Sequence, residues 1–481
     1  MRAHLFRFSF ASLVAASALA ASVQACSKDD PSTGTDDQAV SNAQLGDIKH
    51  WVILYLENHS FDNLYGEFEG AENLKSLAPN APNMVQVDEN GAPYGALPMA
   101  LKSDGGLADP RLPSGLPNGP FAIEEYIPSE LTTSDLHHNF ITEQRQINGG
   151  KMNQFVLWSD ARGLSMGHYK TANLQLAKYA KDYVLCDHFF HAAFGGSFLN
   201  HQWLIAARTP EYGTTAPTTG IVDPNTLKYG ETEGPAYFDS QDNKWYAVNT
   251  SYSVSPPHPA NVGTNPLVPL QTYDNIGDRL TAANVDWAWY SGGWNVAVAW
   301  KPGSNLPAPT ESRFQYHHQP FVYFARYAEG TPGRTHLKDE DDFFAAAAAG
   351  KLPAVSFVKP AGIDNEHPGY APVARGELHA AKVVEAVMQS PTWNQTAIIV
   401  AYDEHGGFWD HVAPPKGDKW GPGSRVPAMI ISPFVKKGTV DHTVYDTTSI
   451  LATLEKRFNL PPLTSRDAHA KDMTAAFNFM H

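Results

Sequence analysis

The chain has little cysteine and little positive charge. Among its 481 residues only Cys26 and Cys186 are cysteines, and we predict that Cys26 is used in processing. Cys186 then has no intramolecular partner, which excludes a disulfide framework. Lys and Arg number 35 against 50 Asp and Glu, a formal net charge of −15. Because an acidic surface is repelled by phosphate backbones, we expect no nucleic-acid partner.

A hydrophobic run long enough to span a membrane is also lacking, but residues 1–25 have the pattern of an export signal. Two arginines precede an apolar stretch rich in Ala and Leu, which ends in small residues. Residues 23–26 (Val-Gln-Ala-Cys) resemble a lipobox, which predicts a lipid anchor at Cys26, with ordinary secretion as the alternative. We therefore expect export from a bacterial cytoplasm, as a periplasmic or outer-membrane lipoprotein or as a secreted protein. Residues 26–46 contain little to bury and are predicted to be a disordered tether.

The rest of the chain, residues 47–481, is predicted to be one α/β domain. Strand-like apolar runs alternate with polar loops and helical segments, which predicts a three-layer α/β/α sandwich with a mostly parallel central sheet. Two long Pro- and Gly-rich insertions are expected near residues 71–130 and 210–275. The predicted strands are 48–56, 183–190, 287–290, 352–358, 397–402 and 428–432, and the predicted helices are 171–180, 345–349, 379–388 and 447–458.

Several of these predicted strands are followed directly by polar residues. Glu57-Asn58 and Asp403-Glu404 each come directly after a buried run, and Gly195-Gly196-Ser197 follows another. Because the carboxyl ends of parallel strands lie at one edge of a sheet, these side chains are expected to meet. Carboxylate, amide and hydroxyl oxygens suit one divalent cation, of unknown identity, that would activate the serine.

Other interpretations of these residues stay open at this point. Asn58 and Ser197 could each cap a helix. A Ser-His-Asp arrangement for acyl transfer is a second alternative, because acids and histidines follow Ser197 in the chain. The glycines at 406 and 407 are interpreted as room for substrate, and Asp410-His411 as support for the neighbouring ligands.

Several motifs, in this order, resemble the bacterial phosphoesterase family of acid phosphatases and phospholipases C, within the alkaline phosphatase-like superfamily. They are Glu-Asn-His-Ser-Phe-Asp at 57–62, Gly-Gly-Lys-Met at 149–152, Gly-Gly-Ser-Phe-Leu-Asn-His at 195–201, Asp-Asn-Glu-His-Pro at 364–368, Tyr-Asp-Glu-His-Gly-Gly-Phe-Trp-Asp-His-Val at 402–412 and Gly-Pro-Gly-Ser-Arg-Val-Pro at 421–427. The segment at 195–201 is most similar to the acid phosphatase branch. The resemblance implies an alkaline phosphatase-like fold and a covalent phosphoserine intermediate.

The resemblance also implies roles for individual residues. Ser197 would be the nucleophile and His367 the acid for the leaving group. The implied metal ligands are Glu57, Asn58, Ser197, Asp403 and Glu404, and the implied substrate contacts are Asn58, His138, Asn200 and His318.

These observations lead to three functional hypotheses. The first is a metal-dependent acid phosphatase that hydrolyses small-molecule phosphomonoesters, with the acidic optimum implied by the resemblance alone. The second is a phospholipase C that cleaves phosphodiester headgroups of membrane phospholipids. The third is a non-catalytic surface lipoprotein. The sequence predicts neither the oligomeric state nor the physiological substrate.

Overall fold

The computed structural model describes residues 40–102, 106–259, 262, 266–301, 308–310 and 312–479. The predicted signal at 1–25, Cys26 and most of the predicted tether lie outside these residues. The end of the tether is folded: Ser41 caps helix α1 (Asn42–Leu45), and Leu45 is buried. The folded part therefore begins before the predicted boundary at residue 47. None of the helices in the described ranges is long and apolar enough to cross a membrane.

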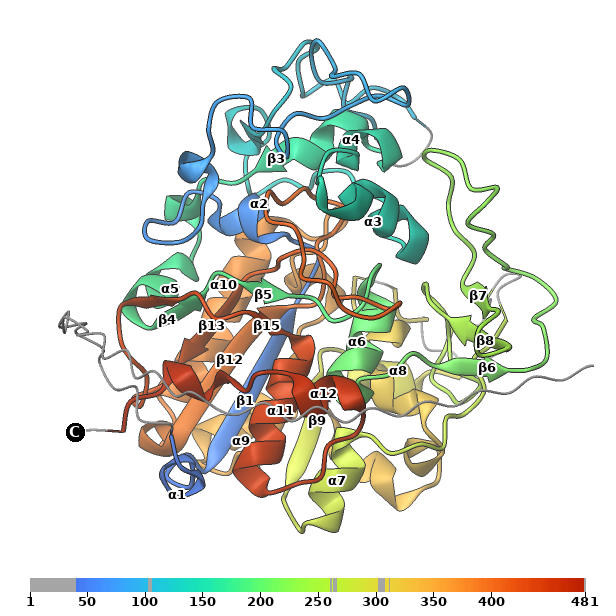
Figure 1. The fold of residues 1–481 in the computed structure, drawn as a ribbon. Helices are drawn as coiled ribbons and strands as arrows, with labels where there is room; N and C mark the ends of the chain where they lie inside the picture. Colours follow the sequence, from blue (N-terminus) through green and yellow to red (C-terminus); the bar gives the residue numbers. More distant parts are fainter. Residues whose placement is uncertain are drawn as a thin grey trace, which may run out of the picture. The chain divides into compact units, whose positions relative to one another are not determined.

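A sheet of eight strands forms the centre of the described domain. Figure 1 shows the neighbouring strands β1, β12 and β13 of this sheet. All neighbouring strands pair in parallel except β13, which runs antiparallel to both of its neighbours. The predicted mostly parallel sheet is confirmed. The strand order is β10 (Leu337–Asp339), β9 (Trp287–Ser291), β11 (Val355–Lys359), β1 (His50–Leu56), β12 (Thr396–Tyr402), β13 (Ala428–Ile431), β4 (Val184–Cys186) and β14 (Thr439–Asp441).

The two long strands β1 and β12 lie side by side in the middle of this sheet. Their parallel register places Leu56 opposite Tyr402, and both strands are almost completely buried. Such burial on both faces explains the continuous apolar runs in their sequences. Glu57 and Asp403, the next residue of each strand, therefore lie at the same edge of the sheet.

Helices cover both faces of the sheet, which confirms the α/β sandwich. Successive side chains of β9 point to opposite faces. The ring of Trp289 lies 6.1 Å from His201 in α6 (Ser197–Ala206), whereas the ring of Tyr290 lies 5.4 Å from Phe343 in α9 (Glu340–Ala348). Helices α7 (Ile276–Ala282) and α11 (Thr447–Phe458) contact α6, and α10 (Val373–Met388) contacts α9. Figure 1 shows α11 in front of the sheet.

The predicted elements differ from the observed ones mainly at their ends. Helix α11 has the predicted bounds, but α9 and α10 begin earlier than predicted, at Glu340 and Val373. The segment 171–180 forms only a 3₁₀ turn and the start of α5 (Ala177–Asp182). Within the described residues of 71–130, which exclude 103–105, the helices and strands are short pieces such as β2 (Phe121–Ala122). Within 210–275 a small antiparallel sheet of β6 (Glu211–Gly213), β8 (Lys244–Ala247) and β7 (Ala236–Asp239) is present.

Candidate active site

The loops after β1 and β12 bind each other directly. The backbone N–H of Asn58 donates to Asp403 Oδ1 at 3.1 Å, across 345 residues of sequence. Asn58 has φ of 62°, a left-handed conformation that Asn tolerates better than most residues. The predicted meeting of the two strand ends is thus observed.

Gly406 and Gly407 allow the loop after β12 to approach neighbouring protein. A Cβ atom at Gly406 would lie 2.0 Å from the carbonyl oxygen of Asn58, and one at Gly407 would lie 2.7 Å from the Cβ of Leu136. Protein atoms already fill this space. The prediction that these glycines leave room for substrate is wrong; they are required by close backbone packing.

Ser197 is the first residue of helix α6 and lies beside both strand ends. Its hydroxyl donates to Asn58 Oδ1 at 3.2 Å, and Glu404 Oε1 lies 3.5 Å away. The free N–H groups of a first helical turn favour a bound anion. Ser197 is therefore placed where an oxyanion would be stabilised, and no histidine is among its side chain's hydrogen-bond partners in the described chain.

Glu57 is held by two cationic or polar neighbours. Lys359 Nζ lies 2.6 Å and His318 Nδ1 lies 2.7 Å from Glu57 Oε1. Burial raises the pKa of Glu57, but the charge of Lys359 and of nearby histidines outweighs burial and leaves the pKa below its usual value. Glu57 is therefore a carboxylate at neutral pH.

Asp403 and Glu404 have the opposite shift. Burial, and the charge of Glu57, raise the pKa of Asp403 to about 6 even though Lys359 lowers it. Burial and the charge of Asp403 hold the pKa of Glu404 well above its usual range. Of these three buried carboxylates, Glu57 is the one that forms an ion pair with a lysine in the described part of the chain. This excess of negative charge is what a divalent cation would offset.

The donor atoms at this place fit such a cation. All five predicted ligands offer oxygen: Glu57, Asn58, Ser197, Asp403 and Glu404. Asp403 Oδ2 is buried and has no hydrogen-bond partner in the described part of the chain. Oxygen donors with several carboxylates suit hard divalent ions.

Histidines lie beside Asn58, Glu404 and Glu57. His138 Nε2 lies 3.2 Å from Asn58 Nδ2 and 3.7 Å from Glu404 Oε1, whereas the side chain of His137 lies beside Thr232. The rings of His138 and His367 are 5.7 Å apart. The structure therefore brings His138 and His367 together at the site, as predicted, and places His318 against Glu57.

Asn200 does not fit its predicted role as a substrate contact. Its Nδ2 donates to the carbonyl oxygens of Ala193, Gly195 and Gly196, and its Oδ1 accepts from the N–H of Ala193. The side chain is completely buried. Asn200 therefore shapes the loop before Ser197 and has no free group for substrate.

Two residues of the site were missed in the sequence. The predicted strand 352–358 ends one residue before Lys359, although a lone charge at the end of a buried run is a signal of a functional position. His201 lies one helical turn after Ser197, and its Nδ1 donates to the Ser197 carbonyl at 2.7 Å. Its ring stacks on His318 with centroids 4.7 Å apart, and its Nε2 has no partner among the described residues.

The loop that carries Ser197 is anchored by Glu143, in helix α3 (Phe140–Ile147). Glu143 accepts from the N–H of Gly195 at 2.6 Å, from His191 Nε2 at 2.8 Å and from the N–H of Ser424 at 2.8 Å. Burial raises the pKa of Glu143, but His191, His405 and these hydrogen bonds lower it to about 2. A charged carboxylate thus fixes the conformation of the loop that precedes Ser197.

A second buried network supports the loop after Glu404, as predicted for Asp410 and His411. Arg425 donates from Nε to Asp410 Oδ1 at 2.9 Å and from Nη2 to Asp62 Oδ1 at 3.2 Å. Asp62 Oδ2 lies 2.6 Å from His411 Nδ1. These charges are paired with one another, so the network orients the loop.

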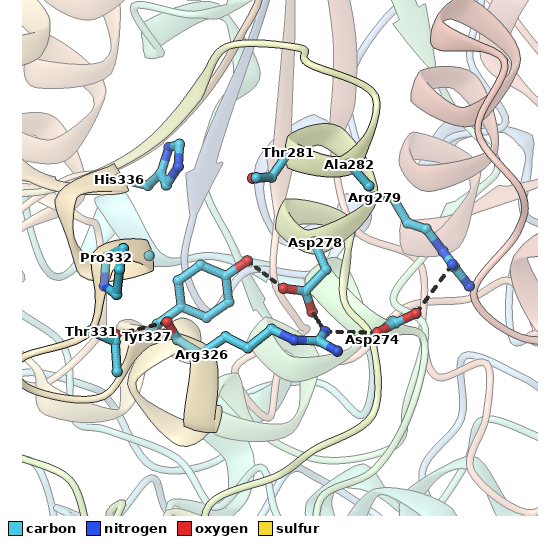
Figure 2. Close-up of a pocket in the computed structure, with 11 residues that line it drawn as sticks. Asp274, Asp278, Arg279, Thr281, Ala282, Arg326, Tyr327, Thr331, Pro332 and His336 are labelled. Carbon is cyan, nitrogen blue, oxygen red and sulfur yellow. Dashed lines mark hydrogen bonds and ion pairs between the residues drawn. The ribbon is translucent and has the colours of Figure 1, made fainter.

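A cavity of about 690 Å³ lies elsewhere, between α7 and residues 326–336, and is drawn in Figure 2. Arg326 points between two carboxylates there, 2.7 Å from Asp274 and 2.6 Å from Asp278. The hydroxyl of Tyr327 donates to Asp278 at 2.8 Å. None of the predicted site residues lines this cavity.

Comparisons with known proteins cover the whole of this site. The sequence profile of the Phosphoesterase family matches residues 48–461. Phospholipase C B of Mycobacterium tuberculosis is 28% identical over 472 residues, which cover 90% of this chain and 78% of that protein. Non-hemolytic phospholipase C of Pseudomonas aeruginosa is 25% identical over 484 residues, which cover 91% of this chain and 58% of that protein. A solved protein of the alkaline phosphatase superfamily from Vibrio parahaemolyticus aligns with a TM-score of 0.35 and 10% identity, over 72% of this chain and 73% of that one.

Proposed function

The chain belongs to the Phosphoesterase family and is a phosphoric ester hydrolase, and on this premise we propose that it cleaves phosphoesters through a covalent phosphoserine at Ser197. The observation that carries the proposal is the surrounding of the Ser197 hydroxyl. Asn58 and Glu404 bind the hydroxyl. Ser197 is also the first residue of a helix, whose free N–H groups favour a bound phosphoryl group.

In the first step the Ser197 oxygen attacks phosphorus and the bond to the leaving oxygen breaks. Glu404 Oε1, at 3.5 Å, accepts the hydroxyl proton. His367 gives a proton to the leaving oxygen; its Nδ1 lies 2.7 Å from the Pro368 carbonyl, which orients the ring and leaves Nε2 to carry that proton. In the second step the oxygen of a water molecule attacks phosphorus while His367 takes its proton. The bond from phosphorus to the Ser197 oxygen breaks, and Glu404 returns the proton to Ser197.

Glu57, Asn58, Ser197, Asp403 and Glu404 would hold one divalent cation. When bound, the ion supplies positive charge that lowers the pKa of the Ser197 hydroxyl and stabilises the phosphoryl oxygens. Lys359 and His318 keep Glu57 ionised and oriented. We further propose that Asn58, His138 and His318 contact the phosphoryl group. Asn58 bonds the Ser197 hydroxyl, His138 Nε2 lies 3.2 Å from Asn58 Nδ2, and His318 lies against Glu57.

For the substrate we propose the phosphodiester headgroup of a phospholipid. The relatives reported above are named phospholipase C, so they support this alternative better than the acid phosphatase that the sequence favoured. Phosphomonoester hydrolysis stays as a second candidate because residues 195–201 resemble the acid phosphatase branch. Acyl transfer is not supported, since the hydroxyl of Ser197 bonds an amide and a carboxylate instead of a histidine.

The test compares hydrolysis of phosphatidylcholine with that of a soluble aryl phosphomonoester. Ser197→Ala should lower kcat for the true substrate roughly a thousandfold or more. Ser114→Ala, at an exposed position, is the matched control. Unchanged turnover in Ser197→Ala would disprove the mechanism. Cleavage of the lipid but not of the monoester supports a phospholipase C, and the reverse result supports a phosphatase.

A further inference from the structure

A second cluster of histidines and carboxylates lies outside the active site, at the ends of β4 and β14. These strands pair in parallel, with Cys186 opposite Asp441. The residues that follow, Asp187 and His442, are therefore neighbours, and His188 comes next after Asp187. None of them belongs to the catalytic machinery.

The two histidines converge on the carboxylate of Asp187. Asp187 Oδ1 lies 2.9 Å from His188 Nδ1 and 3.0 Å from His442 Nδ1, and Asp187 Oδ2 lies 2.9 Å from His442 Nδ1. The carboxylate of Asp187 is completely buried, whereas the side chain of His442 is 60% exposed. The cluster is thus rigid on its inner side and open to solvent on its outer side.

Glu72 orients this cluster from a third segment of the chain. Its Oε2 lies 2.9 Å from His188 Nε2, and its backbone N–H donates to Asp187 Oδ2 at 2.8 Å. A carboxylate bound to the far nitrogen of a histidine fixes the ring so that the other nitrogen faces a metal. Glu72 therefore leaves Nδ1 of His188 directed at the centre of the cluster.

We propose that Asp187, His188 and His442 bind a zinc ion at this surface. Two imidazole nitrogens and one carboxylate oxygen are a donor set that zinc accepts, with water in the remaining position. Among the other clusters in the described residues, Asp135, His138 and His367 belong to the active site already described, and the remaining two are closed or already paired. Glu143, His191 and His405 are completely buried around the loop before Ser197, and the charges of Asp62, Asp410 and His411 are paired with Arg425.

The ion would join segments that are distant in the chain. Arg425 Nη1 donates to the carbonyl oxygens of both Glu72 and Asp187, so the cluster adjoins the network that supports the loop after Glu404. Asp187 is also ten residues before Ser197. The site therefore acts as a structural clamp on the edge strand β14 and on the chain that leads to the nucleophile.

The test uses the full-length protein, freed of metal with a chelator and then dialysed against zinc chloride. His442→Ala should bind one zinc equivalent fewer than the wild type, whatever the active site binds, and zinc should raise its Tm less. Glu72→Gln keeps all three ligands and should weaken zinc binding at this site by about 10- to 100-fold. His469→Ala removes an exposed histidine outside the cluster and should behave like the wild type.

Equal zinc content in the wild type and in His442→Ala would overturn the proposal. Unchanged zinc affinity in Glu72→Gln would overturn the orienting role of Glu72. Because the side chain of His442 is 60% exposed, we expect His442→Ala to fold, so that its zinc content can be compared with that of the wild type.

Discussion

Lys359 shows how one buried charge sets the protonation of the catalytic carboxylates. Its Nζ is 2.6 Å from Glu57, and its charge is the main factor that overcomes the effect of burial on the pKa of Glu57. Glu57 is thereby kept ionised in a place where Glu404, without such a partner, has a raised pKa. The difference in pKa between these two glutamates comes from Lys359, at the end of β11. Lys359 lies outside the motifs that contain Glu57 and Glu404.

Lys359→Met keeps the apolar stem and removes the charge. We expect the pKa of Glu57 to rise, so that Glu57 becomes protonated at a higher pH and the acid limb of kcat/KM moves to higher pH. The measurement is the pH profile of kcat/KM. Lys351→Met, at an exposed position, should leave the profile unchanged. An acid limb that stays in place would show that Lys359 does not control Glu57.

Helix α3 and the loop before Ser197 form one unit through Glu143. A Cβ atom at Gly195 would lie 2.7 Å from the backbone nitrogen of Phe140, and φ of Gly195 is +88°, so only glycine fits there. Glu143 links helix α3 to this loop by accepting a hydrogen bond from the N–H of Gly195. The position of the nucleophile thus depends on an element some fifty residues earlier in the chain.

Glu143→Gln should destabilise the domain in a pH-dependent way. The pKa of Glu143 falls from 4.5 to about 2 on folding, so its contribution is complete above pH 4.5 and is lost as the pH falls towards 2. At pH 7 we expect the variant to lose roughly 3 kcal/mol of unfolding free energy. Urea unfolding at pH 7 and pH 3.5 should show the deficit shrinking by about 1 kcal/mol. Glu130→Gln is the exposed control, and a deficit independent of pH would refute the charged state of Glu143.

The elements that the sequence predicted best are those whose pattern is complete within one segment. β1 and β12 are continuous apolar runs followed by carboxylates, and both were predicted together with their meeting. The direction of β13 could not be predicted, because an apolar run has the same composition in either orientation. The contacts of Asn200 could not be predicted for a related reason. Whether its amide faces substrate or backbone depends on the path of the loop before Ser197, which the sequence alone does not specify.

At the scale of the whole molecule, the active site joins parts of the chain that are hundreds of residues apart. Glu57 and Asn58, Ser197, His318, Lys359, and Asp403 with Glu404 come from five separate segments. Each motif is recognisable alone, but the contacts of Lys359 with Glu57 and of His201 with His318 form only when the segments meet. A cation held by three of these segments would therefore stabilise the folded domain as a whole.

Removal of the active-site cation should lower the unfolding free energy by RT ln(1+[M]/Kd), which is about 2.7 kcal/mol at a concentration of 100 times Kd. The measurement is the Tm with a chelator and with added divalent ion, in the His442→Ala background so that the surface site does not contribute. Glu404→Gln removes one ligand and also one of the mutually repelling carboxylates. Its metal-free form should thus be at least as stable as the metal-free parent, while its response to the ion should be small. An equal response in both proteins would place the stabilising ion elsewhere.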